Sequence, residues 1–109
     1  MPFFDLDRIG RDLPFARAVP QLRQALHGGV AVVQAPPGTG KTTVVPPVVA
    51  EFVAGDAAAA PGRVVVVQPR RVAARAAARR LAALSGTRPG DVVGWSVRGE
   101  REVSARTRV

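Results

Sequence analysis

The chain has 109 residues, no cysteine, 47% hydrophobic residues and a net charge of +8. This length allows one small domain or part of a larger one, and the lack of cysteine excludes disulfide frameworks and thiolate metal sites. No stretch is long and apolar enough for a transmembrane helix, and the amino terminus lacks the order of a signal peptide, so we expect a cytoplasmic protein without membrane contact.

The positive charge lies in one part of the chain. Residues 1–62 contain five basic and five acidic side chains, whereas residues 63–109 contain eleven arginines and three acidic residues. The whole excess of +8 therefore belongs to the second segment. Such an asymmetry favours a polyanionic partner.

The amino-terminal part is predicted to differ from the rest. Residues 1–19 contain prolines, which interrupt regular secondary structure, and are expected to be an irregular segment. Residues 20–109 are expected to form part of one domain. Residues 20–27 are predicted to be a helix that two glycines end. An apolar run at residues 30–33 then predicts a buried strand.

A glycine-rich motif follows that strand. The residues from Ala35 to Thr42 have the pattern A-x-x-G-x-G-K-T, with a second apolar segment after them. Gly38 and Gly40 allow backbone conformations that a Cβ would obstruct, so that successive N–H groups can face one phosphate at the positive end of a helix. A strand, this turn and a helix start predict a phosphate-binding loop.

Two side chains in this loop carry the expected chemistry. Lys41 is the only lysine among 16 basic residues, and its flexible ammonium would reach the β- and γ-phosphates. Thr42 would offer a hydroxyl to Mg²⁺. Ala35 replaces the first glycine of the usual motif, which is a mild change because that position begins the turn. The predicted nucleotide contacts are Ala35, Pro36, Pro37, Gly38, Thr39, Gly40, Lys41, Thr42 and Thr43.

The remaining pattern predicts an α/β fold. A helix from Lys41, kinked or broken at Pro46-Pro47, leads through a connection at residues 55–62 to a β-branched strand at residues 63–68. Strand, helix and strand at this spacing predict a right-handed βαβ unit with a parallel sheet. The later elements are predicted as a helix at residues 70–84, a strand at 91–97, a polar connection at 100–104 and the start of a strand at 107–109.

A second group of polar residues follows the second strand. Gln68, Pro69, Arg70 and Arg71 come directly after it, at the edge of a parallel sheet where the phosphate-binding loop should also lie. Arginines at a helix amino terminus interact unfavourably with the helix dipole unless an anion compensates their charge. A phosphodiester backbone would do so, and we predict a nucleic-acid contact at these four residues.

Three motifs together resemble the DEAH group of superfamily 2 helicases. They are A-P-P-G-T-G-K-T-T at residues 35–43, Q-P-R-R-V-A-A at 68–74 and G-W-S-V-R at 94–98. Within that group the chain is similar to the bacterial HrpB-type helicases over roughly residues 13–109. The phosphate loop alone also occurs in AAA+ ATPases, so Q-P-R-R-V-A-A is the specific element.

The resemblance implies a P-loop fold, the front half of a RecA-like helicase domain. It implies that residues 35–43 bind ATP with Mg²⁺, and that residues 68–71 contact the backbone of a single-stranded nucleic acid, RNA in preference to DNA. The family's D-E-x-H, S-A-T and arginine-finger motifs are not in this sequence. We therefore expect a domain truncated at its carboxyl end, without catalytic residues of its own, which binds but does not hydrolyse. An AAA+-type ATPase and a non-hydrolysing binding module are the alternatives.

Arg80 is predicted to lie within the apolar arc of the helix at residues 70–84, at about 100° per residue. Arg71, Arg75 and Arg79 are predicted to form a separate solvated stripe. The resemblance implies that Arg80 stacks on the adenine of the nucleotide, for which a guanidinium plane is well suited.

Overall fold

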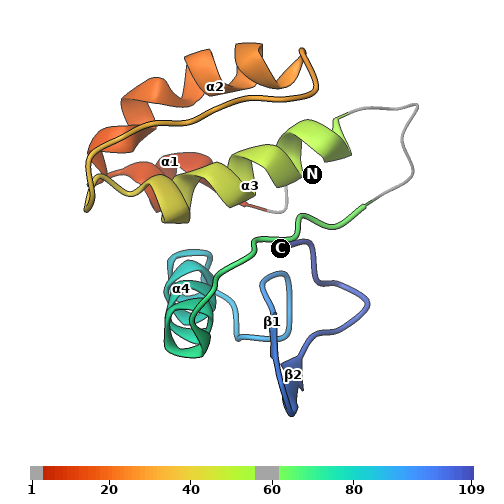
Figure 1. Ribbon diagram of the computed structural model, residues 1–109. Coiled ribbons are helices and arrows are strands. Elements are labelled where there is room, and N and C mark those ends of the chain that lie inside the picture. Colours follow the sequence, from red (N-terminus) through yellow and green to blue (C-terminus); the bar gives the residue numbers. More distant parts are fainter. Residues whose placement is uncertain (1–3, 56–61) are drawn as a thin grey trace.

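A computed structural model of the protein describes residues 4–55 and 62–109. Part of the expected connection at residues 55–62 and the first three residues of the amino-terminal segment lie outside these ranges. The elements are α1 (Leu6–Gly10), a 3-10 helix η1 (Pro14–Ala18), α2 (Val19–Leu26), α3 (Lys41–Ala54), α4 (Arg71–Leu84), β1 (Trp95–Val97) and β2 (Glu100–Glu102). Helix α3 lies centrally, between α2 on one side and α4 with the strands on the other, and α1 contacts both α3 and α4 (Figure 1).

The amino-terminal segment is structured where irregular chain was expected. The Oδ1 atom of Asp5 accepts a hydrogen bond from the Arg8 N–H and caps α1. Phe4 and Ile9 are buried in a cluster that joins α3 to α4. The prolines that suggested irregularity fit helix starts instead, since Pro14 and Pro20 each occupy the first turn of a helix.

A kink or a break was expected at Pro46-Pro47, and the break does not occur, because helix α3 runs without interruption through both prolines (Figure 1). Both prolines remove helical hydrogen bonds near the start of the helix. Both are also buried, and burial of their rings in the core offsets part of that loss.

The predicted parallel sheet is not confirmed. Residues 30–33 and 63–68 are extended, but neither segment forms a strand, and the sheet found in the described part of the chain is the antiparallel pair β1-β2. Its register pairs Trp95 with Glu102 and Val97 with Glu100. The expected strand at residues 91–97 is thus reduced to its last three residues, and the expected connection after Glu100 becomes β2.

The physical reason is a lack of pairing partners. Val30 is 86% exposed and Val65 is 81% exposed, which is unlike the buried strands that their composition predicts. Without the regular ladder of a sheet, most valines of the two segments remain exposed to solvent.

The carboxyl-terminal residues nonetheless contact two other extended segments. The Val64 N–H donates to the carbonyl of Arg108 over 2.8 Å, and the Arg108 N–H donates to the carbonyl of Val92 over 2.8 Å. The Gly94 N–H donates to the carbonyl of Val109 over 2.9 Å. Residues 107–109 therefore lie between the other two segments, without the regular ladder of a strand.

Two hydrophobic clusters flank α3. One contains buried residues of α1, α3 and α4 together with Val92 and Val93. The other contains Phe15, Leu22, Val44 and Val48 and fills the space between η1, α2 and α3. Helix α3 is therefore fixed from both sides, which also fixes the loop that leads into it. Among the described residues, no helix has the length and hydrophobicity needed to cross a membrane.

Candidate functional site

The glycine-rich loop lies between the extended segment at residues 30–34 and the start of α3, in the predicted order. Gly38 and Gly40 have φ values of 81° and 94°, which residues with a Cβ atom rarely adopt. Gly40 is the N-cap of α3, and its carbonyl accepts hydrogen bonds from the N–H groups of Thr43 and Val44. The loop thus turns directly into the positive end of a helix that is long enough to carry a macrodipole.

Two side chains close the loop upon itself. The Lys41 ammonium donates to the carbonyl of Ala35 over 3.2 Å. The Thr39 hydroxyl donates to the carbonyl of Pro36 over 2.8 Å. An open hollow of about 430 Å³ lies beside this turn, with Lys41 in its lining. The only lysine of the chain therefore reaches back to the first residue of the loop.

Thr42 is the residue for which the sequence predicts a contact with Mg²⁺. It is exposed in the first turn of α3. No group of three or more histidine, cysteine or acidic side chains in the described ranges could hold a metal ion.

The second group of candidate residues lies at the start of α4. Arg70 is the N-cap in an extended conformation with no side-chain capping bond, and Arg71 is the first helical residue. Both are exposed, as is Pro69, while Gln68 is half-buried.

A cavity connects the two groups. It has a volume of about 90 Å³, and both Thr42 and Gln68 contribute to its lining. The expectation that the two motifs meet at one edge of the domain is met at these two residues, although the parallel sheet that motivated it is absent from the described chain.

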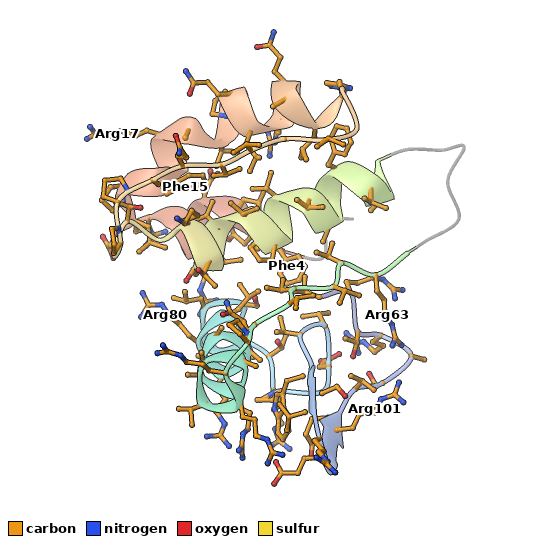
Figure 2. All side chains as sticks on the ribbon, viewed as in Figure 1. Phe4, Phe15, Arg17, Arg63, Arg80 and Arg101 are labelled. Carbon is orange, nitrogen blue, oxygen red and sulfur yellow. The ribbon has the colours of Figure 1, made fainter. Side chains whose placement is uncertain are left out.

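Arg80 does not lie within the buried face of α4, so that prediction is wrong. The buried residues of the helix are Ala78, Leu81 and Ala82, whereas Arg80 is exposed. Figure 2 shows its side chain extending away from the body of the protein, on the side of the amino end of α3. The predicted arc was centred on the wrong side, because Val72 is itself 77% exposed.

The predicted solvated stripe is also wrong at one position. Arg75 forms an ion pair with Glu100 and lies over the ring of Trp95. The sequence interpretation missed these contacts because the partners are far apart in the chain. It likewise missed the segment from Leu13 to Phe15, where the Phe15 N–H donates to the carbonyl of Thr39 in the loop over 2.8 Å.

Comparison with known proteins tests the predicted resemblance to a family. No family model matches the chain. The chain is 38% identical over 98 residues to the ATP-dependent RNA helicase HrpB of Escherichia coli, and 34% identical over 95% of its length to a putative DEAH-box ATP-dependent helicase of Mycosarcoma maydis. It is 38% identical over 100 residues to the mouse ATP-dependent RNA helicase DHX33. The resemblance to DEAH-type ATP-dependent helicases is confirmed.

The similarity covers nearly all of this chain but little of each helicase. The three matches include 89%, 95% and 91% of the chain, and 12%, 7% and 14% of the respective relatives. The DEAH-type relatives imply a RecA-like P-loop fold.

Proposed function

We propose that the chain is the amino-terminal part of the first motor domain of an ATP-dependent RNA helicase that acts in the cytoplasm. The observation that carries this proposal is the loop at residues 35–43. Its two glycines have positive φ values, its lysine bonds back to the carbonyl of Ala35, and its last glycine caps α3. A turn with glycines at positive φ and this lysine fits a phosphate cradle, since the backbone N–H groups and the helix end all favour an anion.

In this proposal the nucleotide binds through its phosphates. The Lys41 ammonium exchanges its hydrogen bond with the Ala35 carbonyl for charge-assisted bonds to the β- and γ-phosphate oxygens. Thr42 provides one ligand to Mg²⁺, and the metal when bound neutralises charge on the phosphates. Arg80 is exposed on the same side as the amino end of α3, where it is free to stack on the adenine.

The nucleic-acid strand is proposed to contact the residues from Gln68 to Arg71. The two arginines are exposed at the amino end of α4, where the helix dipole disfavours their charges and a phosphodiester compensates them. The shared cavity between Thr42 and Gln68 supports a direct mechanical link between the nucleotide and the strand.

The chain is proposed to bind without turning over ATP by itself. Fast phosphoryl transfer requires a group that orients water and an arginine that stabilises the transition state. The family motifs that supply these groups are not in this sequence. The behaviour of the chain alone is then that of a nucleotide-binding module.

The decisive experiment is calorimetric titration of Mg-ATP into the wild-type protein and the Lys41→Ala variant. A charged hydrogen bond contributes about 1.5–3 kcal/mol, so the variant should bind roughly ten- to a hundredfold more weakly. Arg23→Ala is the matched control, because it removes an exposed cation from α2. Equal affinity of the wild-type and Lys41→Ala proteins, with an unchanged circular dichroism spectrum, would show that the loop does not hold the phosphates.

A further inference from the structure

A short amino-terminal segment supports the glycine-rich loop from behind. The Phe15 N–H donates to the carbonyl of Thr39 over 2.8 Å. Leu13 packs on Gly40 so closely that a Cβ added to the glycine would lie 2.8 Å from the Cβ and Cδ1 atoms of the leucine. The segment therefore contacts two consecutive loop residues, Thr39 through a hydrogen bond and Gly40 through the apolar Leu13 side chain.

The same segment contacts the chain before and after the turn. Phe15 is 7% exposed and belongs to the cluster that includes Val44 in the first half of α3. Val33 and Ala35, which precede the turn, pack against that cluster as well. The extended approach to the loop, the turn and the helix that follows all share this support.

The segment is itself stiff. Leu13 has φ −109° and ψ 123°, which is the extended conformation that a following proline imposes. Pro14 has a fixed φ and begins η1, so the residues on both sides of it have little freedom. A stiff support can hold its neighbour in one conformation, whereas a mobile one would move with it.

The hydrogen bond also determines which way one peptide group points. In a planar trans peptide the carbonyl of Thr39 and the N–H of Gly40 point in opposite directions. Because the carbonyl points to Phe15, the Gly40 N–H points away from the support. Within the described residues this N–H donates to no other group, which leaves it available to a ligand.

We propose that Leu13 and Phe15 are positioning residues that hold the Thr39–Gly40 peptide in the orientation needed to bind phosphate before the nucleotide arrives. This inference rests on the proposed function of the loop. The proposed effect is preorganisation. The turn is ordered when the protein folds, so nucleotide binding does not have to supply the free energy of ordering it. Loss of the support should weaken nucleotide binding without removing any group that touches the nucleotide.

The test compares Leu13→Ala with Leu26→Ala in the full-length protein. Both leucines pack against the same cluster, but Leu26 does so from α2 and is not among the atoms that meet Gly40. Leu13→Ala should weaken Mg-ATP binding roughly three- to tenfold, because a few loop dihedrals would then have to be ordered on binding. Leu26→Ala should not weaken it. Hydrogen–deuterium exchange of residues 36–43 without nucleotide should accelerate only in Leu13→Ala. Leu13→Met, which keeps a Cγ against the glycine, should restore both properties.

Each outcome has a distinct meaning. Equal effects of Leu13→Ala and Leu26→Ala on binding and on loop exchange would reduce Leu13 to an ordinary core residue and overturn the inference. Unchanged binding in Leu13→Ala, with binding lost in Lys41→Ala, would overturn the inference and leave the proposed function intact. Wild-type protein that does not bind Mg-ATP would overturn both.

Discussion

Arg75 of α4 lies over the indole ring of Trp95 in β1, with its guanidinium carbon 5.7 Å from the ring centroid. Its Nη1 atom is also 3.2 Å from the Oε2 atom of Glu100 in β2. The two charged side chains are 30% and 53% exposed, so water screens the ion pair and the aromatic contact contributes the larger share. One arginine thus joins a helix to both strands of the hairpin.

We predict that Arg75→Ala destabilises the chain by about 1 kcal/mol, the sum of a partly exposed cation–π contact and a weak ion pair. Trp95 is the only tryptophan, so its fluorescence during urea unfolding measures both the loss of stability and the changed environment of the ring. Arg79→Ala is the control, since Arg79 is exposed one turn further along the same helix. Identical emission spectra for the wild-type and Arg75→Ala proteins would contradict the observed stacking.

Thr107 provides a second prediction about stability. This residue is 2% exposed, and its hydroxyl donates to the carbonyl of Asp91 over 2.6 Å and accepts from the Ser104 N–H over 2.9 Å. Thr107→Val would leave these groups without their partner, at a cost of about 1–3 kcal/mol in the free energy of unfolding. Thermal denaturation of the variant measures this loss.

Thr87 offers a matched control for the same substitution. Its Oγ1 atom is buried and has no hydrogen-bond partner among the described residues. Removing an unsatisfied buried hydroxyl should be neutral or stabilising. If Thr87→Val lowered the melting temperature as much as Thr107→Val, the two hydroxyls would have equal roles and the difference in bonding would be irrelevant.

The proposed nucleic-acid interface is tested by the salt dependence of binding. If Arg70 and Arg71 each neutralise one phosphate of single-stranded RNA, Ala at both positions should flatten the slope of log K against log salt by roughly 1.4, at about 0.7 per contact. Fluorescence anisotropy with a labelled oligonucleotide measures the slope. The double variant Arg17→Ala/Arg23→Ala, which removes two exposed arginines from the other half of the chain, should leave it unchanged. Weaker binding with an unaltered slope would place the phosphate contacts elsewhere in the basic segment.

The adenine role of Arg80 is tested in the full-length protein. Arg80→Ala should weaken Mg-ATP binding about threefold or more, because a cation–π stack is lost, and should not affect inorganic triphosphate, which has no base. Arg79→Ala, an exposed neighbour on the same helix, should affect neither ligand. Comparable losses for both ligands would assign Arg80 to the phosphates or to the fold.

Local sequence signals predicted the elements that depend on neighbouring residues. The helices expected at residues 20–27 and 70–84 are found as Val19–Leu26 and Arg71–Leu84. The loop has positive φ values at the glycines where the motif requires them. Turn chemistry, helix starts and ends and the motifs of the candidate site act over a few residues, and the sequence therefore determined these features by itself.

Tertiary structure decided the features that depend on distant partners. The valine runs at residues 30–33 and 63–68 have the composition of strands, yet a strand forms only where another chain segment accepts and donates its hydrogen bonds. The buried face of α4 was set by which elements pack on it, and the pairing of Arg75 with Glu100 joins residues 25 positions apart. The support of Gly40 by Leu13 has the same origin, because periodicity within one element carries no information about what a second element brings to it.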